Sequence, residues 1–486
     1  MKPITLTKTI IGSAALAGFL TFASAQDGSS SLKLSDALEN AVYLQEGEAD
    51  LDAAAKAYEN ILAETDLIDS LAAETRFRLA SVYLEQEKDA LAFKILGDLV
   101  ANYPDQAPWV AEAQALLPKE FVPEITPWKD GERTWYDWVL PTGNVIGYSF
   151  STIFNYEWEG EMLWRKEARY LMNGHRACVI EFDKDTFETK YSLMSLQGMG
   201  QVRAWYEDDA HAATVAYSKS NSEKNFNFQH RAYDNEQAYE LMRQLPVEVG
   251  YSTKILIFVT FSGMPVEVNF TVTGLETLDT ILGEVECYKV RIDIHGQEQF
   301  CYLTNDEDRM MVKMVAGGLE GILKKVETID YDSTASYENE LHGYSIQLPA
   351  SWGVVPQGEE LKADKKIRVW LAEPTVRGIY ALSSIPNADW SDGSGIELED
   401  FIAMAKKKLS DAEGELDAEW ERELQIGNLR GAAFRASLDS GKEDVPYVYA
   451  LLGPDYHYLL EAKIPSDDIE EMESQLERIV TSISVQ

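Results

Sequence analysis

The stretch Val285–Asp306, with the sequence VECYKVRIDIHGQEQFCYLTND, decides the fold in the middle of this chain. β-branched and aromatic residues dominate both sides of His295-Gly296, which predicts two antiparallel strands joined by a two-residue turn. Such a turn places Cys287 opposite Thr304 and leaves Cys301 on the other face. A disulfide between Cys287 and Cys301 would need a bulge or another turn, so the sequence favours free thiols without deciding the question.

Segments of the same kind surround this hairpin. They are short, rich in β-branched and aromatic residues, and separated by Gly, Asn and Asp. They are Asn144–Trp158, Arg176–Asp183, Glu188–Leu196, Gln201–Glu207, Ala213–Ser218, Thr253–Gly263 and Val266–Gly274. Short connections cannot hold parallel crossovers, so residues 124–332 are predicted to form an antiparallel β-barrel or half-barrel. One helix is expected over Asp234–Pro246, with Asp234 as its N-cap.

Two neighbouring stretches resemble a known family. They are GLETLDTILGEVECYKVRIDI (Gly274–Ile294) and QFCYLTNDEDRMMVKMVAGG (Gln299–Gly318). A Gly-x-Glu-x-Leu strand leads to Leu-Gly and a Cys-Tyr-Lys-Val strand, then to an aromatic strand with an Asp turn and Val-Lys-Met. This order is similar to the bacterial exported family named domain of unknown function 3108, although Cys301 stands where an aromatic residue is expected. The resemblance implies a fold and no activity.

The first residues, MKPITLTKTIIGSAALAGFLTFASAQ, have the features of a secretory signal peptide: two lysines, an apolar run over Ile10–Phe22, and an Ala-Ser-Ala motif. A membrane anchor would need about 20 apolar residues, more than this run provides. A lipoprotein would need a cysteine at the cleavage point, but the first cysteine is Cys178. We therefore expect cleavage after Ala25 and a soluble periplasmic or secreted protein.

Residues 31–118 have a helical pattern, with apolar residues returning every three or four positions. Ala54, Tyr58 and Ile61 recur 38 residues later as Ala92, Leu96 and Leu99. This pattern resembles a pair of tetratricopeptide-type helical hairpins with a connection longer than the usual ~34-residue repeat allows. The resemblance implies a protein-binding surface, and the alternative is a helical spacer. Tyr58 and Leu96 are expected in the core, and the exposed positions are expected to be Lys56, Glu59, Lys94 and Asp98.

Pro118, Pro123 and Pro127 break the helical pattern and mark a linker. A polar hinge then precedes a third module, residues 336–486, in which the stretch GYSIQLPASW (Gly343–Trp352) starts a strand that Pro349 ends. The order of the following strands and helices resembles the PsbP and Mog1-like α/β/α sandwich, a family that mostly supplies docking modules. The predicted fold class is multidomain α+β: α-helical repeat hairpins, then an antiparallel β-barrel or half-barrel, then an α/β/α sandwich.

The formal charge of −39 at pH 7 disfavours nucleic acid and anionic lipid surfaces as partners. The sequence contains no Gly-x-Ser-x-Gly, His-Glu-x-x-His or phosphate-loop motif, so we predict no enzyme activity, catalytic residue, cofactor or metal. Six histidines without a shared spacing are expected at surfaces or turns: His175, His211, His230, His295, His342 and His457. The acidic stretches Asn305–Arg309 and Asp389–Gly395 lack the EF-hand pattern, so solvated turns are favoured over calcium sites.

Six tryptophans crowd one part of the β module: Trp128, Trp135, Trp138, Trp158, Trp164 and Trp205. Aromatic residues can line a glycan or lipid site, but in small barrels they are first of all core and girdle residues. The leading hypothesis is a non-enzymatic cell-envelope adaptor that binds a protein partner through its helical repeats and C-terminal sandwich. The alternative is a carrier with an apolar or lipid-like ligand in the β module, and a hydrolase on that module is least favoured.

Overall fold

The computed structural model describes residues 28–485 except 65–66, 87, 119–120, 124, 173–174, 358–361, 363, 376–377, 388–396, 414, 439–443 and 467–468. The expected signal peptide, residues 1–25, and the acidic stretch at 389–395 lie outside the described residues. The chain divides between Leu117 and Pro118 into two compact units, each described below by itself.

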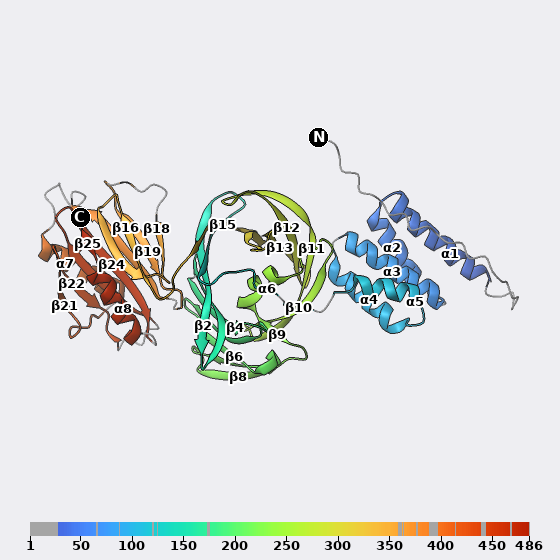
Figure 1. Ribbon diagram of the computed structural model, residues 1–486, viewed down its shortest axis with the longest axis horizontal. Helices are drawn as coiled ribbons and strands as arrows, with labels where there is room; N and C mark the ends of the chain where they lie inside the picture. Colours follow the sequence, from blue (N-terminus) through green and yellow to red (C-terminus); the bar gives the residue numbers. More distant parts are fainter. Residues whose placement is uncertain are drawn as a thin grey trace. The chain divides into compact units, whose positions relative to one another are not determined.

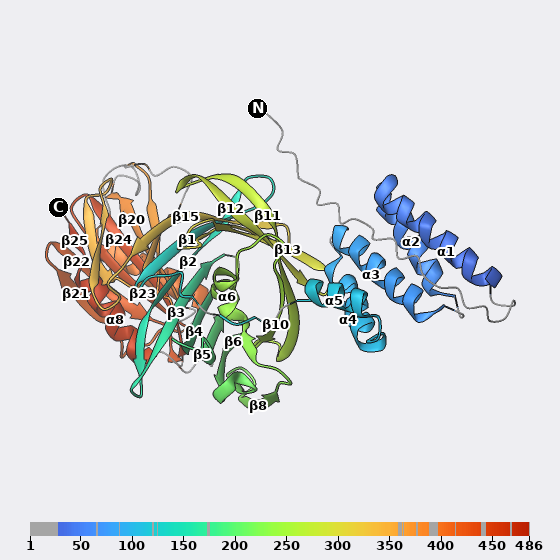
Figure 2. The ribbon, with the colours of Figure 1, turned by 45° about the vertical axis from the view of Figure 1, so that its right-hand side comes forward.

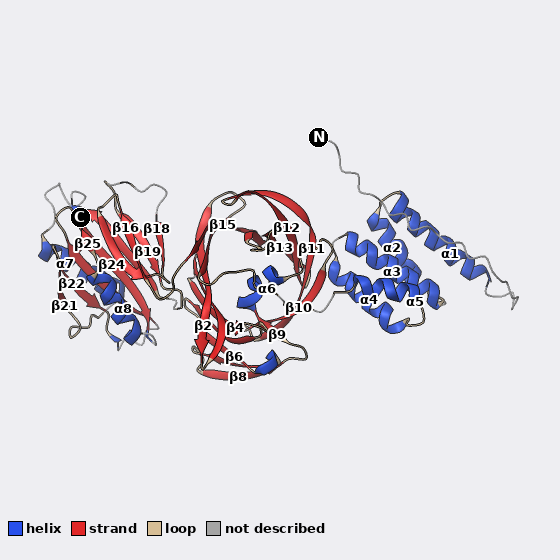
Figure 3. Ribbon diagram, in the orientation of Figure 1, coloured by secondary structure: helices blue, strands red, loops and turns tan. Residues whose placement is uncertain are grey.

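The first unit is helical (Figure 3). Its elements are α1 (Gly28–Val42), the π-helical turn η1 (Tyr43–Gly47), α2 (Leu51–Leu62), α3 (Asp69–Glu85), α4 (Asp89–Asn102) and α5 (Ala107–Leu116). Each α-helix contacts the next one along the chain. Helix α2 begins at a polar cap, because Asp50 Oδ1 accepts a hydrogen bond from Ala53 N at 3.0 Å.

The core of this unit follows the predicted pattern. Ala54 and Tyr58 on α2, and Ala92 and Leu96 on α4, have no exposed surface. The four positions expected outside are exposed: Lys56, Glu59, Lys94 and Asp98. The expected core is therefore confirmed at these positions, whereas the tetratricopeptide resemblance itself stays a prediction.

The second unit begins with a 15-stranded sheet. In chain order its strands are β1 (Glu132–Val139), β2 (Val145–Trp158), β3 (Glu161–Leu171), β4 (Arg176–Asp183), β5 (Thr189–Leu196), β6 (Gly200–Tyr206), β7 (Ala212–Tyr217), β8 (Ser222–Asn227), β9 (Ala232–Asp234), β10 (Ser252–Val259), β11 (Met264–Thr280), β12 (Gly283–Ile294), β13 (Gln297–Thr304), β14 (Met311–Ala316) and β15 (Leu319–Thr328). A short 3₁₀ turn, η2 (Asp208–Ala210), lies between β6 and β7.

This sheet is open. Its spatial order runs from β8 back to β1, continues at β15, and runs back to β9. Only the β9–β10 pairing among these described strands is parallel. Because β8 and β9 end the ladder of described strands, the half-barrel is the form observed and the closed barrel is wrong. Pairing of β1 with β15 joins the two ends of the module.

Side-chain hydrogen bonds, and not backbone pairing between strands, connect the two arms of the curled sheet where they curl around a short helix. Ser192 on β5 and Tyr206 on β6 donate hydrogen bonds of 2.6 and 2.7 Å to Asp234 Oδ2 on β9. Asp234 also caps the 3₁₀ turn η3 (Asn235–Gln237), which leads into α6 (Ala238–Gln244). The predicted cap is thus confirmed, and α6 lies within the curl of the sheet (Figures 1 and 2).

The hairpin of β12 and β13 has the predicted register. Cys287 lies opposite Thr304, and Cys301 lies opposite Val290. The two thiols belong to different clusters, since Cys301 packs with the α6 residues and Cys287 packs with Val312. All three cysteines are free and buried.

The rest of the second unit contains two further sheets. The smaller one consists of β16 (Thr334–Asn339), β17 (Tyr344–Pro349) and β25 (Ser484–Val485). The larger has seven strands in the order β18 (Gly353–Gln357), β19 (Ile367–Ala372), β20 (Ile379–Pro386), β24 (Tyr456–Pro465), β23 (Asp444–Leu452), β22 (Leu429–Arg435) and β21 (Arg422–Ile426).

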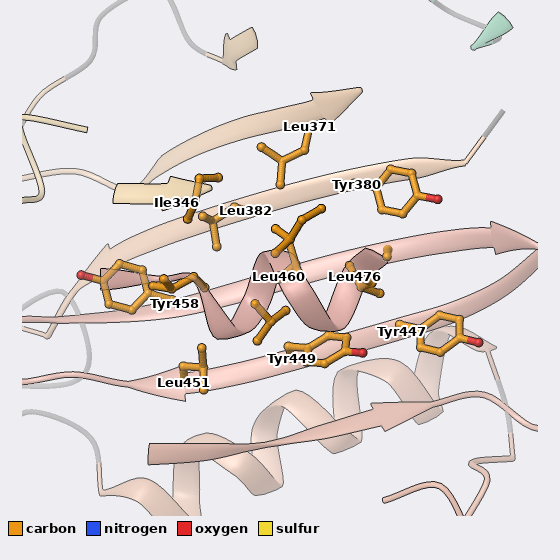
Figure 4. Close-up of a cluster of buried hydrophobic side chains, with 14 of the residues drawn as sticks. Ile346, Leu371, Tyr380, Leu382, Tyr447, Tyr449, Leu451, Tyr458, Leu460 and Leu476 are labelled. Carbon is orange, nitrogen blue, oxygen red and sulfur yellow. The ribbon is translucent and has the colours of Figure 1, made fainter. Parts of the chain in front are cut away.

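Two helices cover opposite faces of the seven-stranded sheet. Along β23, Tyr449 and Leu451 pack toward Leu476 of α8 (Ile469–Thr481), as Figure 4 shows. The intervening residues Val448 and Ala450 pack with Phe401 of α7 (Leu398–Glu413). Successive side chains of a strand point to opposite faces, so each helix takes one alternate set. The result is a three-layer arrangement.

Candidate functional site

Strands β1, β2 and β3 present two different faces. On one face, Thr134, Tyr136 and Trp138 line a cavity together with residues of α6. On the other face, Trp135 of β1 packs with Val355 and Trp370 from the C-terminal sheet. The alternation of residues along each strand produces both faces, so the inner face is free to line a site within the curl of the sheet.

An apolar chamber of about 490 Å³ lies inside the curl of the sheet. Its walls come from α6, η3 and the ends of several strands. The lining residues are Trp138, Tyr170, Met172, Arg176, Leu196, Asn235, Glu236, Ala238, Tyr239, Met242, Ile257, Val259, Val266, Val268, Phe270, Ile292, Ile294, Gln299, Met314, Ala316 and Leu319. Most of these side chains are aliphatic or aromatic, as in sites that hold apolar small molecules.

One ion pair belongs to the wall of the chamber. The Arg176 guanidinium contacts both carboxylate oxygens of Glu236, and Glu236 is buried. Burial would raise the pKa of Glu236, but the charge of Arg176, the hydrogen bonds from Arg176 and Cys178, and the charge of Lys166 together outweigh burial and hold this pKa below its usual range. The amide of Asn235 donates to the same carboxylate at 2.7 Å. Glu236 is therefore ionised and fully engaged.

A narrower pocket of about 50 Å³ adjoins the chamber and shares Trp138, Tyr170, Tyr239 and Met314 with it. Two buried ion pairs cross this pocket from α6 to the sheet. Lys166 Nζ lies 2.7 Å from Glu240 Oε2, and Arg243 Nη1 lies 2.6 Å from Glu132 Oε1. Glu240 and Arg243 are three residues apart and share one side of the helix. These pairs tether α6 to the inner face.

The six tryptophans of the sequence prediction lie in four different environments. Trp128 and Trp164 are buried with Phe182 and Phe187, with Trp128 edge-on to the other three rings. Trp135 packs at the outer face and Trp138 lines the chamber. Trp158 and Trp205 are about half exposed, at 55% and 45%. Only Trp138 of the six lines the described chamber, which the spacing of tryptophans alone could not indicate.

The prediction that every histidine lies at a surface or turn is wrong for His457, which is buried within strand β24, whereas His342 is buried in the turn between β16 and β17. His175, His342 and His457 are buried, whereas His211, His230 and His295 are exposed. Two of the buried rings have a side-chain partner at Nδ1: His342 Nδ1 lies 2.7 Å from Ser384 Oγ, and His457 Nδ1 lies 2.8 Å from Asn387 Oδ1. Their partners come from strand β20 and the residue after it, which the sequence spacing did not reveal.

Two acidic side chains of the turn Asn305–Arg309 have protein partners. Asp306 Oδ1 accepts hydrogen bonds from Thr304 Oγ1 at 2.7 Å and from Arg309 N at 3.0 Å, and Asp308 pairs with Lys129. Within the described residues, no group of three or more His, Cys, Asp or Glu side chains is arranged to hold a metal ion. In the same part of the chain, no helix is long and apolar enough to cross a bilayer.

The fold and its site define a class: an open, curled antiparallel sheet that encloses a short helix and an apolar chamber. Residues 166–320 match the family described as Protein of unknown function (DUF3108). No curated protein matches the chain. The matched stretch begins on β3 and contains the resemblance seen in Gly274–Gly318. The family description names no activity.

Several solved structures are similar. A β-barrel-like protein of domain of unknown function DUF1849 from Brucella abortus is 14% identical, with 44% of this chain and 100% of that chain covered and a TM-score of 0.29. PsbP from Synechocystis sp. is 12% identical, covering 32% and 95%, with a TM-score of 0.25. MucB of Pseudomonas aeruginosa, solved in complex with MucA, is 9% identical, covering 73% and 93%, with a TM-score of 0.17.

Proposed function

We propose that the curled sheet is a carrier module that binds an apolar or lipid-like ligand in the chamber. The observation that supports this proposal is the lining of the 490 Å³ chamber, in which aliphatic and aromatic side chains such as Ile257, Val268 and Phe270 predominate. Burial of apolar ligand surface against such a lining contributes about 25 cal/mol per Å². The proposal needs no catalytic step, so the protein acts without being an enzyme.

Filling the chamber tests this proposal. Ala316 ends β14 and lines the chamber, so Ala316→Trp places an indole where the ligand would lie. We expect this variant to lose binding of the neutral fluorescent probe N-phenyl-1-naphthylamine by at least about tenfold. Ala216 on β7, which is also half-buried but does not line the chamber, provides the matched control Ala216→Trp. Equal probe binding by both variants would reject the carrier proposal.

The proposed carrier operates outside the cytoplasm, in keeping with the expected signal peptide. N-terminal sequencing of the protein isolated from its own cells tests this part directly. Cleavage after Ala25 gives a mature chain that begins at Gln26. A chain that keeps residues 1–25 and fractionates with the cytoplasm would reject the exported location.

A protein-binding role is the second candidate, and helix α4 supports it. Leu91, Lys94 and Asp98 share one side of this helix, and Leu91 is 50% exposed. Within the described residues, neither Lys94 nor Asp98 has a side-chain partner. Such a surface, apolar with charges beside it, is what a protein partner would cover.

Reversing the charges tests the adaptor role. The double variant Lys94→Glu with Asp98→Lys should weaken capture of a partner from periplasmic extract while the melting temperature stays the same, because exposed charges contribute little to stability. The control Ala92→Trp changes the buried side of α4 instead and should destabilise the unit by about 1–3 kcal/mol. Unchanged capture by the charge-reversed protein would favour a helical spacer.

A further inference from the structure

The charges in the wall of the chamber cancel. Among the described lining residues, Arg176 and Glu236 carry the formal charges at neutral pH, and they contact each other through both carboxylate oxygens. Asn235 supplies a further donor to Glu236, so neither oxygen of this carboxylate is left for a ligand. A ligand with a charged head would have to break this pair or lie unpaired beside it, and both are unfavourable in a desolvated site.

Neutral polar groups of the lining are uncommitted: Asn235 Oδ1 is buried without a partner among the described residues, and the carboxamide of Gln299 offers both donors and an acceptor. Gln299 lies near the start of β13, opposite Ile292 in the register, and both residues line the chamber. Its side chain is half-buried and has no hydrogen-bond partner among the described residues. A carboxamide offers two donors and an acceptor, which suits a neutral hydroxyl or amide.

We propose that the ligand is an uncharged amphiphile whose apolar chain lies in the chamber and whose neutral hydroxyl or amide head bonds to Gln299. The inference deepens the proposed carrier function and rests on it. The paired Arg176 and Glu236 exclude fatty acids and alkylammonium ions by leaving no charge for them, and the apolar lining excludes fully polar ligands.

Three ligands with the same alkyl chain test the choice of head. Dodecanol, dodecanoate and dodecyltrimethylammonium compete with N-phenyl-1-naphthylamine for the full-length protein, with each ligand kept below its micelle concentration. We expect dodecanol to bind about tenfold more tightly than either ion, since burying an unpaired charge is unfavourable. Tighter binding of dodecanoate or dodecyltrimethylammonium than of dodecanol would overturn the inference.

Two variants test separately the ion pair and the carboxamide in the chamber wall. Glu236→Gln leaves the Arg176 guanidinium without its carboxylate, so dodecanoate should gain about tenfold or more and overtake dodecanol. Gln299→Leu should weaken dodecanol about fivefold and leave binding of the probe unchanged, since a neutral hydrogen bond contributes about 1 kcal/mol. The matched control Glu298→Gln changes an exposed neighbour on β13 that does not line the chamber.

Each outcome is decisive. An unchanged order of ligands in Glu236→Gln, with the melting temperature of the natural protein, would show that the ion pair does not select the head and would reject the inference. If that variant does not fold, Gln299→Leu still decides, because equal losses of probe and dodecanol would point to a damaged chamber and not to a recognised head. Failure of the natural protein to bind the probe at all would reject the carrier function itself.

Discussion

The two faces of β1, β2 and β3 bury cations in different ways. On the inner face, Lys166 lies against Glu240. On the outer face, Arg133 and Arg169 are buried and donate to backbone carbonyls of the C-terminal part, Arg133 to Ser351 at 2.7 Å and Arg169 to Gly378. Burial lowers the pKa of both Arg133 and Arg169 to about 10. Among the described residues, no carboxylate contacts either guanidinium to offset this effect of burial.

This difference shows on which face of the strands substitutions can change the buried charges. Carbonyl acceptors at Ser351 and Gly378 belong to the backbone of the C-terminal part, so the outer contacts exist only when that part is folded against the strands. The inner pairs are side chain to side chain, so substituting both partners can change the charge of the narrower pocket beside the chamber while the backbone contacts stay in place. A binding site fits the inner face, and a permanent contact fits the outer face.

The largest expected effect comes from breaking an inner pair. Lys166→Ala leaves Glu240 buried without a cation, which should lower the free energy of unfolding by about 3–5 kcal/mol. Denaturant unfolding of the purified protein measures this loss. The control is Lys166→Met combined with Glu240→Met, which removes both charges and should recover most of the stability. A double variant no more stable than Lys166→Ala would contradict the electrostatic explanation.

A smaller effect is expected from crowding the outer face. A Cβ atom on Gly353 would lie 2.4 Å from Phe150 Cε1 and 2.8 Å from Trp135 Cη2. Gly353→Ala should therefore destabilise the protein by about 1–3 kcal/mol, because rings packed between two sheets cannot move aside. On the inner face, a Cβ on Gly321 would meet Trp138 at 3.2 Å, beside the chamber.

Gly321→Ala is the matched variant, and thermal melts of the two proteins compare the faces. Trp138 has free space next to it, so we expect Gly321→Ala to lose less stability than Gly353→Ala. Equal losses would mean that the inner face is packed as rigidly as the outer one.

Acid should weaken the outer face. Burial, and then the charge of Arg169, lowers the pKa of His175 to about 4 from an ordinary value near 6.5. The folded state therefore binds fewer protons, and the stability present above pH 6.5 is lost as the pH falls toward 4. Between pH 7 and pH 5.5 the loss should be about 1 kcal/mol.

His175→Phe keeps a ring against Trp370 and removes the titration, so its stability should fall less over the same pH range. His457, whose pKa burial also lowers to about 4, leaves a remaining acid effect of the same sign. An identical pH profile for His175→Phe and the natural protein would show that His175 does not couple acid to the outer face.

The smallest effect is expected where an ion pair is exposed. Lys254 Nζ lies 3.2 Å from Glu267 Oε2 in the same sheet, but these side chains are 42% and 56% exposed. Lys254→Gln should change the free energy of unfolding by less than about 0.5 kcal/mol, because water screens the pair. A loss comparable to that of Lys166→Ala, measured in the same denaturant series, would show that burial is not what distinguishes the inner pairs.

The sequence was sufficient to predict structure where a short local motif, such as a turn or a helix cap, determines it. The His295-Gly296 turn set the register of β12 and β13, and the cap at Asp234 set the start of its helical segment. Strands β1 and β3 were not predicted, because their charged residues break the apolar pattern: β3 alone carries Arg165, Lys166, Glu167 and Arg169 in succession around Ala168. Arg165 and Glu167 pair with each other, but Lys166 and Arg169 are buried by partners that lie far away in the chain, Glu240 and Gly378.

The sequence by itself determined the mixed α and β class, the antiparallel pairing, the core positions of the helical unit and the absence of recognised catalytic motifs. Turns, caps and apolar spacing are local, so they can be identified without knowing what the rest of the chain does. Only the tertiary structure decided that the sheet stays open, that α6 lies inside it, and that Arg176 and Glu236 meet in a chamber wall. These features depend on contacts between residues distant in sequence, and no local pattern specifies such contacts.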